Sequence, residues 1–106
     1  MYEILKSEKE VNGVKVETWK REIWNANALE IEVGTTGYQG GDSGHGCRTY
    51  LRINDLASTD IDVNILKDTF GNISGFELKL GGDAELTTFI EALEFALKVL
   101  KDQSRE

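Results

Sequence analysis

The last quarter of the sequence constrains the fold most, because it carries apolar residues around more than half of a helical circumference. These residues recur at helical spacing and are Leu86, Phe89, Ile90, Leu93, Leu97 and Leu100, with Ala92, Phe95, Ala96 and Val99 widening the stripe. A helix that lies on one sheet needs an apolar arc of only ~100°. The face with Phe95 and Val99 must therefore be covered by a sheet that curls around the helix or by a second copy of the chain, and we expect a homo-oligomer through this face.

Alternation of apolar and polar residues predicts strands in the preceding part of the chain. The predicted strands span residues 2–7, 14–24, 28–33 and 47–53, with two more around 61–65 and 76–80. Within the second, the apolar phase shifts at Trp19, which indicates a bulge or a strand that crosses between two surfaces. Cys47 is interpreted as the first inward residue of its strand, and Asp83 as the helix N-cap.

We therefore predict an α+β fold, in which an antiparallel sheet of five to six strands carries one long C-terminal helix packed on it. The chain of 106 residues forms one domain over 1–102, followed by a polar tail at 103–106.

The charge balance limits the partners of the protein. Nineteen acidic residues against twelve basic ones give a net charge of −7, which argues against binding to duplex nucleic acid. The N-terminus lacks a signal-peptide pattern, and no apolar run approaches the ~18 residues that span a bilayer. We expect no membrane partner and a cytoplasmic location, in the cytosol of a bacterial host.

A glycine-rich segment joins two of the predicted strands. It runs from Gly34 to Gly46 and contains six of the eleven glycines, while the chain has no proline. Glycine lets a ligand approach backbone N–H groups, and such a composition suits phosphate or ribose. The alternative is a long mobile hairpin loop. We expect a binding loop that is mobile when empty and ordered when occupied.

Several sharper motifs fail on spacing or context. Neither a dinucleotide fingerprint nor a P-loop is present, and Ser43 with His45 lacks the orienting group of a catalytic triad. Asp42, His45 and Cys47 supply three metal ligands in one segment, without the second pair of a structural zinc site. We therefore expect a protein that is not an enzyme, with no catalytic residues, no metal and no cofactor.

Two further groups of residues have both a binding and a structural interpretation. Arg48, Tyr50 and Arg52 share one strand face and could bind phosphate and stack on a base. Cross-strand ion pairs with Glu30 and Glu32 would use much of that positive charge. Trp19 offers a stacking surface, although a tryptophan in a small protein is more often part of a core or an interface.

Two stretches resemble small uncharacterised proteins of Gram-positive phages and mobile elements. They are the segment Glu32–Tyr50 and the helix opening Gly81–Ile90, about 30 residues together. In size, β-rich body and C-terminal helix the chain is also similar to phage anti-defence sponges. That resemblance implies sequestration of a nucleotide immune signal without turnover.

The sequence thus predicts a non-catalytic protein that sequesters a small, anionic, nucleotide-like ligand. The predicted ligand-binding residues are Thr35, Thr36, Tyr38, Gln39, Ser43, His45, Arg48, Tyr50, Arg52 and Trp19. The alternative is an acidic protein–protein inhibitor or nucleic-acid mimic that acts on a host protein. The identity of the ligand, the number of subunits and the existence of a host target are left open by the sequence.

Overall fold

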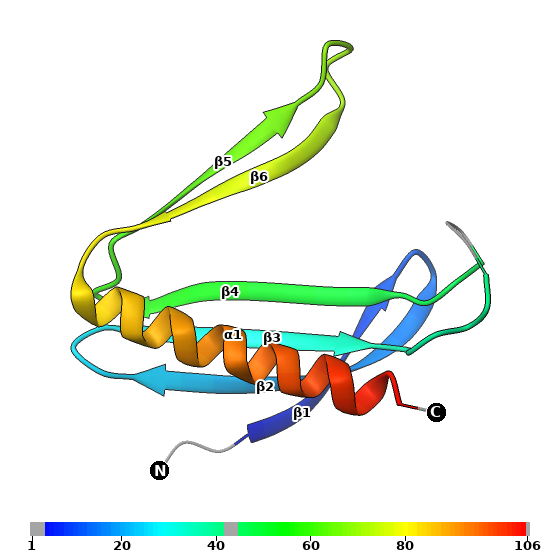
Figure 1. Ribbon diagram of the computed structural model, residues 1–106, viewed down its shortest axis with the longest axis horizontal. Helices are drawn as coiled ribbons and strands as arrows, with labels where there is room; N and C mark the ends of the chain where they lie inside the picture. The colour runs from blue at the N-terminus through cyan, green and yellow to red at the C-terminus, as the bar shows by residue number, and fades with distance from the viewer. Residues whose placement is uncertain (1–3, 42–44, 106) are drawn as a thin grey trace.

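The computed structural model describes residues 4–41 and 45–105 and confirms the α+β class (Figure 1). Six antiparallel strands precede one helix. They are β1 (Ile4–Val11), β2 (Val14–Trp24), β3 (Ala28–Thr35), β4 (Thr49–Ala57), β5 (Ile61–Lys67) and β6 (Ile73–Leu80), followed by α1 (Asp83–Gln103). The fourth strand starts two residues later than predicted and runs four residues further.

The strands divide into two sheets, where the sequence analysis expected one. Strands β1 to β4 form a meander in chain order, and β5 pairs only with β6. The β5–β6 hairpin leads away from the body of the molecule (Figure 1). Its direction is set at its root, where Ser58 adopts a positive φ of 58° and breaks the extended path between β4 and β5.

Hydrogen bonds fix this root to the body. The Gly81 N–H donates to the carbonyl oxygen of Asp60 at 3.1 Å, and the Thr59 hydroxyl donates to the carbonyl oxygen of Ala28 at 3.2 Å. The buried Asn27 amide donates to the hydroxyls of Thr59 at 2.9 Å and Thr88 at 3.0 Å. Asn27 therefore ties the β2–β3 turn, the hairpin root and the helix together.

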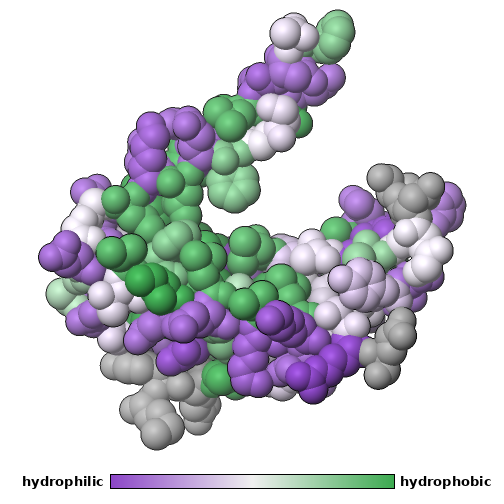
Figure 2. Space-filling view, viewed as in Figure 1, coloured by the Kyte–Doolittle hydropathy of each residue, from purple (hydrophilic) through white to green (hydrophobic). Residues whose placement is uncertain are grey.

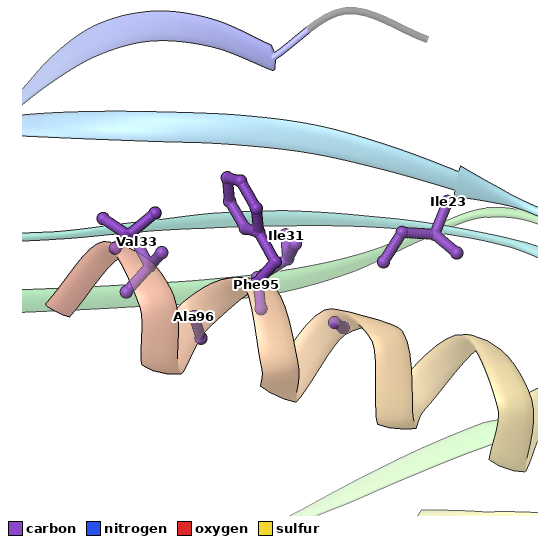
Figure 3. Close-up of a cluster of buried hydrophobic side chains, with 7 residues drawn as sticks. Ile23, Ile31, Val33, Phe95 and Ala96 are labelled. Carbon is purple, nitrogen blue, oxygen red and sulfur yellow. The ribbon is translucent and has the colours of Figure 1, made fainter. Parts of the chain in front are cut away.

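Helix α1 covers the middle of the four-stranded sheet and packs mainly on β3 and β2. Its buried residues are Thr88, Ala92, Phe95, Ala96 and Val99. All of them except Thr88 pack with Ile23, Ile31 and Val33 of the sheet in one hydrophobic cluster (Figure 3). Full burial of each large apolar side chain contributes roughly 1.5–3 kcal/mol.

Two sequence-based expectations about this helix are wrong. Phe95 and Val99 are 7% and 8% exposed against the chain's own sheet, so they are not the face of an oligomer. Asp83 lies inside the first turn, and the N-cap is Gly82, without a side-chain capping bond. Asp83 and Glu85 still place acidic groups at the favourable end of the helix dipole.

The phase shift within β2 is not a bulge, because Val16 and Thr18 are buried on one surface of the sheet and Ile23 on the other. The pairing of β2 with β1 and β3 has no register shift. Ile23 faces the helix, while Thr18 is fully buried on the opposite surface and donates to Glu32 Oε2 at 2.6 Å. A glycine is needed at position 34, where the β2 backbone comes close, since a Cβ at Gly34 would overlap the carbonyl oxygen of Glu17.

Strand β1 lies near β4, and a carboxylate is buried between them. Glu32 is fully buried. Its Oε1 lies 3.7 Å from Lys9 Nζ and 3.7 Å from Arg52 Nη1 and accepts no hydrogen bond. The Lys9 ammonium also lies 5.9 Å from the ring centroid of Tyr50 on β4. Two partly exposed cations therefore compensate one buried negative charge.

The close approach at Gly34 gives a first prediction. Gly34→Ala should lower the free energy of unfolding by about 1–3 kcal/mol, because the new methyl group overlaps backbone that cannot rotate away. Urea denaturation measures the change. Gly75→Ala is the matched control, since a Cβ there meets nothing closer than 3.8 Å. Equal stability of the two variants would contradict this close approach of β2 to Gly34.

The buried carboxylate gives a second prediction. Glu32→Gln should destabilise the fold by about 1–3 kcal/mol. The neutral side chain would leave the two cations without a counter-charge, and its amide nitrogen could also face them. The control is Glu17→Gln, whose carboxylate is 51% exposed beside Lys6 and should change stability by less than ~0.5 kcal/mol. A neutral or stabilising Glu32→Gln would show that the two cations do not depend on this charge.

Candidate functional site

The structure distributes the predicted binding residues over separate hollows instead of one site. Thr35 and Tyr38 line a hollow of about 270 Å³ beside the glycine-rich segment. Tyr50 and Arg52 line one of about 330 Å³ between β4 and the β5–β6 hairpin. Trp19 lines one of about 300 Å³ along α1. Ser43 lies outside the described residues, and His45 is exposed.

The hollow beside the glycine-rich segment, called the glycine hollow below, is where the end of β3, the start of β4 and the last turn of α1 meet. Its lining consists of Thr35, Gly37, Tyr38, Cys47, Thr49, Leu100, Lys101 and Ser104. Hydroxyl groups come from three different elements or their flanks. Tyr38 is 78% exposed at the rim. The lining thus offers hydrogen-bonding groups, an aromatic ring and one ammonium group.

Threonine side chains hold the base of this hollow together. The Arg48 N–H donates to Thr36 Oγ1 at 2.9 Å, and the Thr36 N–H donates to the Arg48 carbonyl oxygen at 3.0 Å. The hydroxyls of Thr35 and Thr49 lie 3.0 Å apart. The Thr35 N–H donates to Gln103 Oε1 at 2.8 Å. These bonds join both ends of the glycine-rich segment to each other and to the helix.

Several glycines of the segment are required by the backbone itself. Gly37 has a φ of +80°, and a Cβ there would lie 2.7 Å from the carbonyl oxygen of Gln103. A Cβ at Gly41 would lie 2.8 Å from His45 backbone atoms, and Gly40 has a φ of +77°. Gln39 donates back to the Thr36 carbonyl oxygen at 3.1 Å. The path of the segment accounts for these glycines without a ligand.

The arginine face is largely engaged with protein groups. Arg52 Nη1 donates to Glu30 Oε1 at 2.8 Å and lies 3.7 Å from Glu32 Oε1, so the cross-strand ion pair is confirmed for Arg52. Arg48 Nη1 donates to the Gly46 carbonyl oxygen at 2.8 Å. Arg48 thereby supports the segment from outside the glycine hollow, whose lining does not include it.

Trp19 belongs to the edge of the core. It packs against the buried cluster, and Lys6 Nζ lies 5.9 Å from its ring centroid. In the adjoining hollow Lys98 Nζ donates to Asp102 Oδ2 at 2.9 Å, a hydrogen bond that lowers the pKa of the Asp102 carboxyl. The cation nearest to this tryptophan hollow on the helix is therefore already paired.

Cys47 is not an inward residue of a strand. It is exposed and lies two residues before the first residue of β4, outside the alternation of that strand. Among residues 4–41 and 45–105, no group of three or more His, Cys, Asp or Glu side chains could hold a metal ion. Asp42, one of the considered ligands, lies outside the described residues.

Lys101 and Ser104 line the glycine hollow without having been predicted. The sequence could not assign them to this hollow, because they are far from Thr35 along the chain and only the fold brings the last helical turn to the end of β3. Lys101 makes no ion pair or hydrogen bond with another side chain in the described part of the protein. It is the cation through which this hollow could meet an anion.

Comparison of the chain with protein-family models, with curated proteins and with solved structures finds no match. The described portion of the chain also contains no helix with the length and hydrophobicity needed to cross a bilayer.

Proposed function

We propose that the protein is a non-catalytic binding protein that sequesters a small, nucleotide-like anion in the glycine hollow. The observation that carries this proposal is Lys101, whose ammonium has no partner side chain among the described residues and which lines a hollow together with hydroxyl-bearing residues and Tyr38. A phosphate group would meet Lys101, and a base would stack on Tyr38.

The position of the ammonium group matters because the hollow lies at the C-terminal end of α1. The free carbonyl groups there carry partial negative charge, which disfavours an anion. Ser104 N–H already donates to the Leu100 carbonyl oxygen at 3.0 Å, which satisfies one of them. The positive charge of Lys101 would have to outweigh the repulsion from the remaining carbonyl groups. Removal of this charge should therefore lower the affinity for an anion strongly.

The lining favours binding over turnover. It contains hydroxyl, thiol, phenol and ammonium groups, and no carboxylate or imidazole belongs to its described residues. General acid–base catalysis uses a pair of groups that exchange a proton near neutral pH, most often including one of those two. A volume of about 270 Å³ accommodates part of a nucleotide, such as one phosphate and one ring.

The third prediction tests Lys101 against a neighbouring lysine. Lys101→Ala should weaken nucleotide binding about tenfold to a hundredfold, because a charge-assisted hydrogen bond to phosphate is lost. Isothermal titration with a panel of mono-, di- and cyclic nucleotides measures the affinity. Lys98→Ala is the matched control, since Lys98 pairs with Asp102 and does not line the glycine hollow.

The fourth prediction concerns the aromatic ring. Tyr38→Ala should cost a similar factor, about 1–3 kcal/mol of stacking free energy, while Tyr50→Ala in the other hollow should leave the affinity unchanged. Native mass spectrometry of the protein purified from cells, before and after mild denaturation, reports a retained ligand directly. Absence of affinity for every nucleotide in the panel, with no retained ligand, would overturn the proposed function.

A further inference from the structure

The β5–β6 hairpin has one apolar face with no layer beneath it. Cross-strand pairing places six apolar side chains on this inner face: Ile61 with Leu80, Val63 with Leu78, and Ile65 with Phe76. The opposite face pairs Asp62 with Lys79 and Asn64 with Glu77. Val63, Ile65 and Phe76 are 51–61% exposed. A two-stranded hairpin is marginally stable alone and needs a layer against its apolar face.

Helix α1 carries a second apolar stripe, on the side away from its buried residues. The stripe consists of Leu86, Ile90, Leu93 and Leu97, which recur at the spacing of one helix face and are 46–57% exposed. It is about 17 Å long at 1.5 Å per residue. The strands of the hairpin run about 23–26 Å, so its inner face is long enough to cover the stripe.

The hairpin and the stripe of one chain are held apart. The root bonds of Gly81 to Asp60 and of Thr59 to Ala28 anchor the hairpin to the body. Asp60 N–H also donates to Glu85 Oε2 at 3.3 Å, which joins the root to the first turn of α1. Figure 2 shows hydrophobic side chains gathered along the hollow between the hairpin and the body. That hollow stays open within one chain.

We propose that a second copy of the chain fills this hollow, in a twofold-symmetric dimer that exchanges hairpins. Each β5–β6 hairpin lays its inner face on the Leu86–Leu97 stripe of its partner's helix. Each helix is then enclosed between its own sheet and the partner's hairpin. The two surfaces are complementary and lie on the same chain, so a twofold axis would let both contacts form at once and close the assembly.

The exposed apolar area suits such a dimer. The stripe, the three exposed hairpin residues and Leu51 on β4, which is 49% exposed, together offer on the order of 600 Å² of apolar surface per copy. A standard interface buries about 800 Å² per partner, a little over half of it apolar. Monomeric proteins rarely expose contiguous apolar patches larger than a few hundred Å², so two such surfaces on one chain indicate an interface.

Unpaired strand edges lie along the same hollow. Strand β4 pairs only with β3 and the hairpin strands pair only with each other, within the described residues. The pocket between them is lined by Leu51 and Ile53 of β4 and by Val63 and Phe76 of the hairpin. An edge strand without a covering element is open to pairing with another strand. A strand-bearing partner therefore fits this hollow better than a lone helix does.

Light scattering coupled to size-exclusion chromatography at micromolar concentration tests the dimer. The test compares substitutions of two neighbouring residues that lie on opposite faces of β5. The wild-type chain should elute at twice its mass of 11.8 kDa. Ile65→Asp, on the inner face, should give the monomer mass, and so should Ile90→Asp on the helix. Leu66→Asp, on the outer face, is the matched control and should remain dimeric. A wild-type monomer would overturn the proposal. So would a dimer that persists in both the Ile65→Asp and the Ile90→Asp variant.

A mixing experiment distinguishes hairpin exchange from pairing of helix with helix. A heterodimer of the Ile65→Asp and Ile90→Asp chains keeps one intact hairpin–helix contact, whereas each homodimer has a defect in both. Native mass spectrometry of an equimolar mixture, with one chain labelled with ¹⁵N, should therefore show heterodimer well beyond the twofold statistical excess over either homodimer. Circular dichroism checks that each variant is folded. A folded pair that forms no heterodimer beyond the statistical excess would overturn the exchange.

Discussion

The packing of α1 on β3 and β2 is the interaction on which the rest of the structure depends. Near its start the helix contributes Thr88 to the buried contact with Asn27, which also holds the hairpin root. At its end Gln103 accepts from Thr35 and donates to the Glu17 carbonyl oxygen. The buried stripe between these points therefore positions both the β5–β6 hairpin and the glycine hollow.

The small size of the residues on that stripe explains the surplus of apolar surface elsewhere. Ala92, Ala96 and Thr88 let the helix approach the sheet closely, and Phe95 fills the space between them. The bulky residues Leu86, Ile90, Leu93 and Leu97 are left on the outer side. The inner face of the hairpin is also uncovered in the same chain. One interface that covers the helix stripe with a hairpin would bury both exposed apolar surfaces.

The class of the fold could be predicted from the sequence because it rests on local periodicity. Alternation in residues 14–24 and 28–33 and helical spacing after Asp83 each report one element without knowledge of the others. The face of the helix that meets the sheet could not be predicted, because both stripes are apolar and Leu86–Leu97 carries the larger side chains. Burial there is decided by close approach, which favours Ala92 and Ala96.

The candidate site was predictable to the extent that its parts are close in the sequence. The ion pair between Arg52 and Glu30 followed from alternation in two strands joined by one connection. Lys101 could not be assigned to the same hollow as Tyr38, since the fold joins residues that are far apart along the chain. Assigning Cys47 to the inside failed because β4 begins only at Thr49, so the alternation of the strand does not extend to Cys47.

The glycine-rich segment acquires a different physical meaning from its contacts. Gly34 and Gly37 are needed where β2 and the end of α1 approach the backbone, and Gly41 where the segment approaches itself. The density of glycine is therefore not by itself an argument for a ligand. The Lys101 ammonium and the Tyr38 ring are the groups that favour a ligand in this hollow. Because hydrogen bonds of Thr35 and Thr36 already fix the base of the hollow, binding there would require little ordering of the described part of the segment, and less entropy would oppose it.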